Sequence, residues 1–453
     1  MADRAISSLD WRGTDFDPAG ALVIRDAAVL DPRTGIDGRH DIVVRDGEIA
    51  ELAAAGSGAA DDAEVIEADG RAIFPAFFDP HVHLRTPGRE DKEDIETGSR
   101  AAAAGGFCGI LAMANTDPPV DMASHVGALR EQAREQAAIP TGFMATVTRE
   151  MKGRELSEMA DLAEAGAVGF SDDGLPIQSA RVMRRALQYQ RLVGLPIALH
   201  EEDAELSSGG SMHEGSVSAG LGVAGIPSTS ESTMIARDCA LAAYEEARIH
   251  VQHLSALESV SVVEQAKAAG VEVTCEATPH HLTLTDEEVR SLDSRFKMNP
   301  PLRTEADRQA LIGGIRSGTI DCIATDHAPH TSSEKEVPFE QASMGVIGLE
   351  TAFAVLYTEL VLPGVLQLAT VVERLGGGAA ALGFATPKIA PGERANLVLC
   401  DLEAEWEAGA EGWESRSDNS CFAGRSLRGR VLMTVAAGRV AYRQRSFAMG
   451  VAS

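Results

Sequence analysis

The chain has 453 residues, 44% of them hydrophobic, and a formal net charge of −28 from 68 acidic and 40 basic side chains. This length exceeds the size at which one hydrophobic core usually stops growing, so a large domain with a smaller one is expected. The acidic balance argues against nucleic acid or an anionic membrane as the main partner, and no apolar run approaches the roughly 18 residues of a membrane span.

The start of the chain lacks the basic region and apolar core of a secretory signal, and we expect residues 1–20 to be a polar extension without an assigned function. The six cysteines are scattered, without a Cys-x-x-Cys pair. Scattered thiols in a chain without a signal peptide are typical of a reducing compartment, so we expect a cytoplasmic protein.

Short strands are expected at both ends of the chain. Residues 21–24, 41–44 and 48–52 are apolar segments separated by turn residues such as Asp46-Gly47 and Asp69-Gly70. Segments 395–400, 429–435 and 438–442 have the same character. We therefore expect a small β-sandwich domain formed by both termini, from residues 21–73 and 389–447.

Between residues 74 and 388, strand-like and helix-like segments alternate. Eight apolar runs end near His81, Asn115, Thr148, Asp173, His200, His253, His280 and Asp326. Helical spacing occupies the intervening residues 93–104, 122–137, 178–192, 231–246, 257–268 and 304–316. Eight strand–helix repeats predict an α/β protein with a catalytic (β/α)8 TIM barrel, whose chemistry lies at the carboxyl ends of the strands.

The first of these runs ends in His81-Val82-His83, with Arg85 two residues further on. Residues i and i+2 of a strand project from one face, so His81 and His83 can bind one metal ion while Arg85 holds an anionic group beside it. The alternative is a pair of structural histidines, because one chance His-x-His is unsurprising among 12 histidines.

Residues that can bind metals also follow later strands, which favours a metal site. They are Asp172 and Asp173, His200, His253, and Asp326 with His330. Imidazole and carboxylate together suit zinc, and this number of ligands predicts a two-metal centre with a shared hydroxide. Strand alternation sends Asp172 and Asp173 to opposite sides and leaves open which of them bridges the ions. We expect structural roles for His40, His125, His213 and His250.

The motifs resemble the amidohydrolase superfamily and, within it, the bacterial type I dihydroorotases, over about residues 21–445. The segments that carry the resemblance are 79–88, 92–98, 114–116, 170–174, 297–303 and 324–330. The resemblance implies zinc-dependent, reversible hydrolysis of (S)-dihydroorotate to N-carbamoyl-L-aspartate in de novo pyrimidine biosynthesis. Many relatives bridge their metals with a carboxylated lysine on the fourth strand. This chain has Phe-Ser-Asp-Asp-Gly there, as type I enzymes do, and a carboxylate can also bridge two cations.

The resemblance also implies a role for each site residue. Two zinc ions, bridged by a carboxylate and a hydroxide, are expected on His81, His83, Asp173, His200, His253 and Asp326. Asp326 is the expected catalytic base and then acid, because it can reach the mouth of the barrel without bridging both ions. Substrate contacts are expected from His83, Arg85, Asn115, Asn299, His330, Met344 and Gly345. Of these, Arg85, Asn115 and His330 would bind the carboxylate, and Asn299 with the backbone near Met344-Gly345 would bind the ring amides. Many relatives have Pro-Phe-Gly before the Ile-x-Gly-Leu-Glu segment, where this chain has Ala342-Ser343-Met344-Gly345, a change that backbone contacts tolerate.

Two other functions compete with this interpretation. A hydantoinase-like or allantoinase-like cyclic-amide hydrolase would leave Arg85, Asn115 and His330 without a carboxylate to bind. A non-catalytic scaffold for aspartate transcarbamoylase would have lost metal ligands, yet every ligand position is filled here. The sequence leaves open whether the chain forms a homodimer or a complex with aspartate transcarbamoylase.

Overall fold

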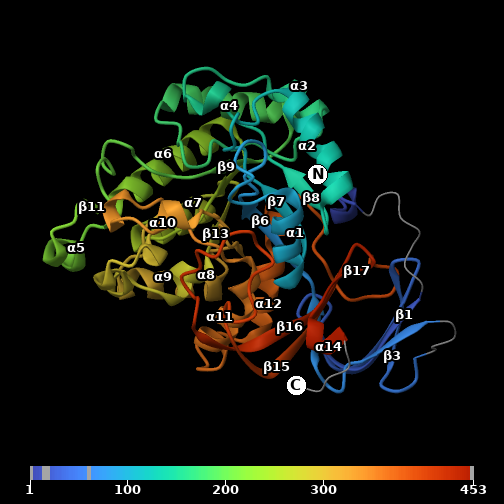
Figure 1. Ribbon diagram of the computed structural model, residues 1–453. Helices are drawn as coiled ribbons and strands as arrows, with labels where there is room; N and C mark the ends of the chain where they lie inside the picture. Colours follow the sequence, from blue (N-terminus) through green and yellow to red (C-terminus); the bar gives the residue numbers. More distant parts are fainter. Residues whose placement is uncertain (1–3, 13–20, 59–62, 449–453) are drawn as a thin grey trace.

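The structure is a computed structural model that describes residues 4–12, 21–58 and 63–448. Its centre is a ring of parallel strands (Figure 1). One sheet contains β6 (Phe77–Val82), β7 (Phe107–Ala112) and β8 (Thr141–Phe143), and another contains β9 (Ile197–Leu199), β12 (Ile249–Val251), β13 (Val273–Ala277) and β14 (Cys322–Ile323). Single bridges join the two sheets: Phe170 pairs with Ala145 and Ile197, and His327 pairs with Val82. These pairings close the predicted eight-membered barrel, in which Phe170 alone represents the fourth strand.

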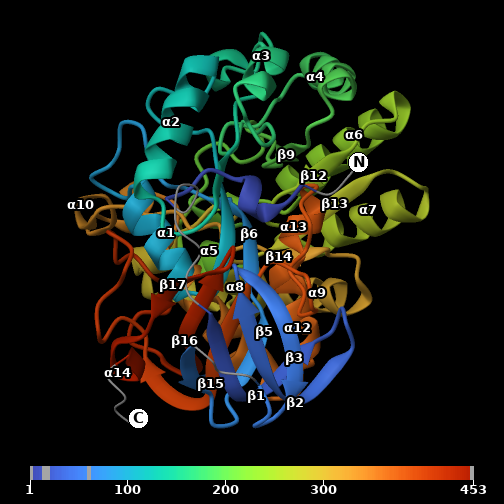
Figure 2. The same cartoon turned by 90° about the vertical axis from the view of Figure 1, so that its right-hand side faces the viewer.

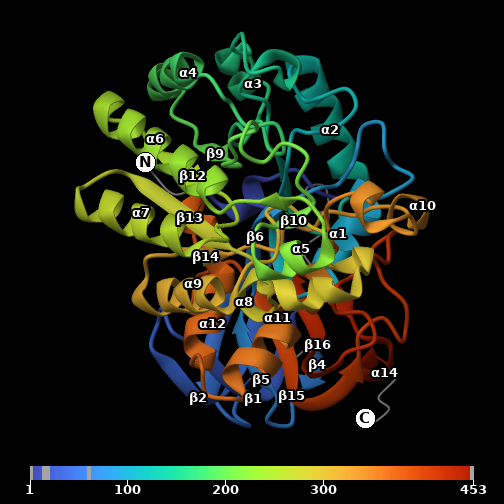
Figure 3. The ribbon, with the colours of Figure 1, turned by 90° about the vertical axis from the view of Figure 1, so that its left-hand side faces the viewer.

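The six helices expected from the sequence begin and end within two residues of their predicted bounds. They are α1 (Ile95–Ala104), α2 (Ala123–Gln136), α4 (Ala180–Val193), α6 (Thr229–Glu245), α7 (Leu257–Ala268) and α9 (Glu305–Ser317). Figure 3 shows α6, α7 and α9 on the outside of the barrel strands. Side-chain caps fix the starts of α1, α4 and α9, as where Asp94 accepts from the amide of Thr97, and Gly318 at φ 85° ends α9.

The remaining helices and one further strand pair are shorter. The helices are α3 (Met159–Glu164), α5 (Ser216–Leu221), α8 (Pro279–Thr283), α10 (Ser332–Lys335), α11 (Ala352–Leu356), α12 (Leu368–Gly376), α13 (Gly378–Ala381) and α14 (Arg445–Ala448), and the strands are β10 (Met212–His213) and β11 (Gly225–Ile226). Helix α10 lies in the polar stretch after β14.

A separate sheet outside the barrel combines strands from both ends of the chain (Figure 2). Its members are β1 (Leu22–Asp31), β2 (Ile36–Arg45), β3 (Glu48–Ala54), β4 (Glu64–Glu67), β5 (Ala72–Pro75), β15 (Leu397–Glu407), β16 (Ser426–Ala436) and β17 (Arg439–Arg443). Strand β5 pairs with β1 on one side and with β15 on the other, so it joins the N-terminal to the C-terminal strands. Glu48 of β3 also bridges Arg394, just before β15, so the sheet curls back around an apolar core of its own that includes Ile24, Ile42 and Leu397.

The segment of residues 4–12 packs against the barrel. Ile6, Leu9 and Trp11 are only 4%, 4% and 5% exposed. A Cβ added at Gly109 of β7 would lie 2.9 Å from the side chain of Ile6, and one at Gly142 of β8 would lie 3.0 Å from that of Leu9. The expectation of a polar extension was therefore wrong for this segment, because three apolar residues in a mostly polar stretch are a weak signal. Residues 1–3 and 13–20 lie outside the described residues.

All six cysteines are buried thiols without a disulfide. Cys275 on β13 and Cys322 on β14 belong to the barrel core. In the part of the chain that the structure describes, no helix is long and apolar enough to cross a membrane.

Candidate metal centre

The six predicted metal ligands meet at the carboxyl end of the barrel strands. His81 lies in β6, and the others follow β6, Phe170, β9, β12 and β14. All six are buried: His81 0%, His83 5%, Asp173 3%, His200 5%, His253 2% and Asp326 7% exposed. Parallel strands of a barrel end at one rim, which is why residues far apart in the sequence come together here.

Asp173 lies at the centre of this cluster. Its Oδ1 atom is 3.7 Å from His81 Nε2, 3.6 Å from His200 Nδ1 and 3.9 Å from His253 Nε2. Its Oδ2 atom is 3.4 Å from His83 Nε2. The two carboxylate oxygens therefore face different histidines, as a carboxylate that bridges two ions requires.

Asp326 lies on another side of the first two histidines. Its Oδ1 atom is 3.1 Å from His83 Nε2 and 3.4 Å from His81 Nε2. Nitrogen and oxygen ligands about 2 Å from one tetrahedral ion lie roughly 3–3.5 Å from each other, so these spacings suit a shared metal. His81 Nε2 is buried and has no hydrogen-bond partner within the described chain, and a metal ion would satisfy it.

Burial and charge act in opposite directions on these ligands. Burial raises the pKa of Asp173, but hydrogen bonds with His200 and His253 bring it well below its ordinary value, so the carboxylate stays ionised. Burial lowers the pKa of His83, which favours the neutral imidazole that metals bind. Burial also opposes protonation of His200, yet Asp173 and Glu202 raise its pKa to about 10. A metal binding to His200 would therefore displace a proton.

Asp172 points away from the histidines. Its Oδ1 atom accepts from the amides of Val147 and Thr148 at 2.8 and 3.1 Å, and its Oδ2 atom accepts from the hydroxyl of Thr148. Burial raises the pKa of this carboxyl to about 6. Asp172 thus anchors the segment that follows β8, and the geometry favours Asp173 as the bridging carboxylate.

Two of the predicted substrate residues contact the cluster directly. Asn115 Oδ1 is 2.9 Å from His83 Nδ1, and Asn115 Nδ2 donates to Asp173 Oδ2 at 3.1 Å. Asn299 Nδ2 donates to Glu202 Oε2 at 2.7 Å and is 3.5 Å from His200 Nε2. Both amides therefore lie within reach of a molecule bound at the metals.

The other predicted substrate residues form a second group on the rim. Arg85 Nε donates to the Pro329 carbonyl at 3.2 Å, and burial together with Arg85 lowers the pKa of His330 to about 3. His330 Nε2 is 2.9 Å from the Met344 carbonyl oxygen. The amide of Gly345 donates to the Lys297 carbonyl at 3.0 Å. A substrate that binds through the backbone near Met344-Gly345 would compete with these contacts.

Three candidate residues hold a left-handed backbone that costs non-glycine residues about 1–3 kcal/mol each. The φ angles are 58° at Arg85, 29° at His253 and 46° at Asp326. Such strain is typical of residues whose side chains are directed into a functional site.

Glu276 is the site residue that the sequence interpretation missed. It is fully buried at the end of β13, with Oε1 2.6 Å from His81 Nδ1 and Oε2 3.0 Å from His250 Nε2. Its Oε1 atom also accepts from the amide of His253 at 3.2 Å. The carboxylate therefore orients His81 so that Nε2 faces the cluster. The feature of the sequence that could have identified Glu276 is that it is a single carboxylate within the apolar run 273–277.

We expect Glu276→Gln to weaken zinc binding by roughly 10- to 100-fold, because an amide supports the imidazole of His81 less strongly than a carboxylate does. Competition with a chromophoric chelator would measure this change. Glu350→Gln is the control, since Glu350 is a half-buried carboxylate that accepts from the amides of Glu414 and Ser415 instead. Equal zinc affinity in both variants and the parent would contradict the role of Glu276.

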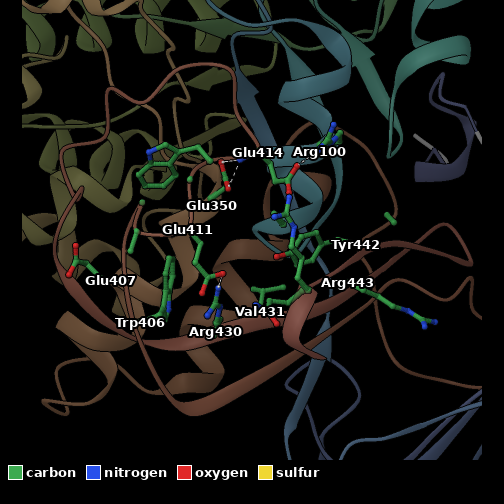
Figure 4. A pocket seen from close by; sticks show the side chains of 18 of the residues that line it. Arg100, Glu350, Trp406, Glu407, Glu411, Glu414, Arg430, Val431, Tyr442 and Arg443 are labelled. Carbon is green, nitrogen blue, oxygen red and sulfur yellow. Dashed lines mark hydrogen bonds and ion pairs between the residues drawn. The ribbon is translucent and has the colours of Figure 1, made fainter. Parts of the chain in front are cut away.

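Neither of two cavities in the described part of the chain is lined by a predicted metal ligand. The larger, about 820 Å³, is lined by Glu350, Trp406, Trp413 and Arg430 among others and by none of the predicted ligands or substrate residues (Figure 4). The smaller, about 410 Å³, is lined by His330 and again by Trp413. We place the reaction at the buried ligands, because cavity size carries no information on chemistry.

Comparisons with known proteins agree with this geometry. A family model described as dihydro-orotase-like matches residues 70–259. The chain is 43% identical over 425 residues to a dihydroorotase of Pelotomaculum thermopropionicum, covering 94% of this chain and 99% of that one. It is 44% identical over 428 residues to a dihydroorotase of Solibacter usitatus, again covering 94% and 99%. An L-hydantoinase (dihydropyrimidinase) from Arthrobacter aurescens superposes with a TM-score of 0.82 at 24% identity, covering 92% of this chain and 95% of that one. This last likeness shows a common fold.

Proposed function

The chain belongs to the dihydroorotase family of metal-dependent cyclic amidohydrolases, and we propose that it hydrolyses (S)-dihydroorotate reversibly to N-carbamoyl-L-aspartate on two zinc ions. The observation that carries the proposal is the buried cluster in which the two oxygens of Asp173 face different histidines. The barrel of residues 74–388 would carry the reaction, and the small β domain of residues 21–73 and 389–447 would support it.

The ligand set divides around Asp173. His81, His83 and Asp326 would hold one ion, and His200 with His253 would hold the other. When bound, the two ions supply a hydroxide nucleophile near neutral pH and polarise the scissile carbonyl. Glu276 behind His81 and Asn115 behind His83 would keep both imidazoles in the orientation that this requires.

Asp326 would move the proton. It takes the proton released by the attack and delivers it to the leaving amide nitrogen, so it acts first as base and then as acid. Burial raises its pKa, but His81 and His83 bring the pKa below its ordinary value. A carboxylate with a low pKa is a weak base, but it can accept this proton because bound metal ions would also make the hydroxide proton more acidic.

The residues on the rim suit a substrate that carries a carboxylate. Arg85 offers a planar fork that binds carboxylate, and Asn115 and His330 lie on the same rim. Asn299 and the backbone near Met344-Gly345 would contact the ring amides, and His83 lies beside both metal and substrate. Hydantoin and dihydrouracil lack the carboxylate and would leave these groups without a partner.

The test is zinc content and turnover on one purified preparation, with dihydroorotate, dihydrouracil and hydantoin as substrates. About two zinc ions per chain with opening of dihydroorotate in preference to the other rings would support the proposal. Turnover of hydantoin or dihydrouracil without turnover of dihydroorotate would overturn the substrate assignment. A protein with neither metal nor turnover would instead fit the scaffold function.

We also propose that the protein is cytoplasmic. Sedimentation velocity of the chain alone, and of the chain with aspartate transcarbamoylase, would distinguish a monomer from a homodimer and from a complex with that enzyme.

A further inference from the structure

Residues 413–419, which we call the strap, cross the rim of the barrel in irregular backbone. Trp413 at its start lines both cavities. Glu350 accepts from the amides of Glu414 and Ser415, and the hydroxyl of Ser417 donates to the Lys92 carbonyl at 2.7 Å. The strap is thus fixed to the barrel before it reaches its last residue, Asn419.

Asn419 links the two loops that carry predicted substrate contacts. Its side chain is buried, and Oδ1 accepts from the amide of His330 at 3.1 Å. Its Nδ2 atom donates to the carbonyls of Ala328 at 3.2 Å and Gly345 at 3.1 Å. Its own carbonyl accepts from the amide of Ile347 at 3.3 Å. One residue therefore bonds to both the loop after β14 and the loop at 344–347, beside the direct backbone bridge between His327 and Val346.

Side-chain packing contributes little to holding these loops where they touch. Gly345 has φ 136°, and a Cβ there would lie 2.8 Å from the Cβ of Ala328 and 3.1 Å from His330 Nε2. The loops meet nearly backbone to backbone, so their relative position depends on hydrogen bonds. These bonds include one from the Ala328 amide to the Val346 carbonyl at 2.8 Å, one from Lys335 Nζ to the Gly345 carbonyl at 3.0 Å, and the contact between His330 and Met344. Asn419 is the residue that accepts from the backbone amide of His330 and also donates to Gly345.

We propose that Asn419 is a positioning residue for substrate: it fixes His330 relative to the backbone at Met344-Gly345, and so sets the geometry in which the substrate's carboxylate and ring amides are recognised together. The inference rests on the proposed function for the identity of the substrate. The hydrogen bonds of the Asn419 side chain reach none of the six predicted metal ligands. Its loss should therefore weaken substrate binding and leave zinc in place.

A purely structural role would also make a buried asparagine costly to replace, so the test needs a matched control. Asn396, just before β15, is similarly buried, accepts from the amide of Ala437 at 2.7 Å and donates to the Arg394 carbonyl at 3.5 Å. It lies in the sheet made from both chain ends, remote from the rim that carries His330. Asn396→Ala removes comparable hydrogen bonds without touching the substrate loops.

The experiment compares the zinc-loaded parent with Asn419→Ala, Asn419→Asp and Asn396→Ala. For both Asn419 variants we expect KM for dihydroorotate to rise by about tenfold or more, kcat to change by less than about threefold, and zinc content to stay the same. Hydrogen–deuterium exchange of the His330 amide should become about tenfold faster in Asn419→Ala. Asn396→Ala should lower the melting temperature but leave KM and this exchange rate within about twofold.

An unchanged KM in both Asn419 variants, or an unchanged exchange rate in Asn419→Ala, would overturn the inference, as would an equal rise of KM in Asn396→Ala. Asn419→Asp keeps the volume and the acceptor for His330 but loses both donated bonds, so it decides the question if Asn419→Ala does not fold. If the parent itself fails to open dihydroorotate, the proposed function falls. The exchange of the His330 amide then decides the positioning role by itself.

Discussion

Asp326→Asn is expected to lower kcat for dihydroorotate by roughly 10²–10⁴-fold while removing much less of the zinc. An asparagine oxygen can still approach His81 and His83, as Asp326 Oδ1 does at 3.4 and 3.1 Å, but an amide cannot accept and return a proton. Stopped-time assays in both directions, with metal analysis of the same samples, would measure the two effects separately.

Asp321→Asn is the control for this change. Asp321 directly precedes β14, at the opposite end of the strand from Asp326, and pairs with Lys267 at 2.7 Å. Its variant should retain turnover within about twofold, apart from any loss of stability. An Asp326→Asn protein with near-parental turnover would show that another group moves the proton.

Asp173→Ala is expected to reduce zinc from about two ions per chain to one or none. Turnover of dihydroorotate should fall by about 10³-fold or more relative to the parent. The physical reason is that its two oxygens face different histidines, so its removal takes one ligand from each ion. Asp173→Glu would keep the charge but displace it, and should bind zinc incompletely. Metal analysis after exhaustive dialysis is the measurement.

The neighbouring carboxylate provides the comparison. Asp172→Ala removes three hydrogen bonds to Val147 and Thr148 and should destabilise the fold by about 1–3 kcal/mol, with zinc retained. Denaturant unfolding of the zinc-loaded proteins would measure this loss. Loss of zinc from the Asp172 variant, with zinc retained in the Asp173 variant, would reverse the assignment of the bridging residue.

The sequence was sufficient to predict the barrel and the set of residues at its rim. Each apolar run ends within five residues of the end of its strand, and parallel strands share one rim, so the order of runs alone brings His81, His200 and Asp326 together. The order of runs does not give the distances between side-chain atoms at the rim. It could not choose between Asp172 and Asp173, because alternation fixes only that they point to opposite sides, and Phe170 is the one residue of the fourth strand that pairs with its neighbours.

Residues whose partners lie far away in the sequence escaped prediction. Glu276 contacts His81 across 195 positions, and Asn419 contacts His330 across 89. Neither residue belongs to a recognisable sequence motif. Asn419 also follows irregular backbone, whose sequence has neither helical nor strand periodicity. Ile6 and Leu9 were missed for a related reason: they pack over Gly109 of β7 and Gly142 of β8, which lie far from them in the sequence.

The pairing of β5 with β15 bears on how the protein is made. Ala72 finds its partner Cys400 only after the ribosome has added the whole barrel, at about 5–20 residues per second. Until then one edge of β5 is a row of unpaired backbone groups, the kind of template on which nascent chains aggregate. A chain terminated before residue 397 would contain every predicted metal ligand and still present that edge. We therefore expect C-terminally truncated products to need chaperones or to precipitate, rather than to work as a smaller enzyme.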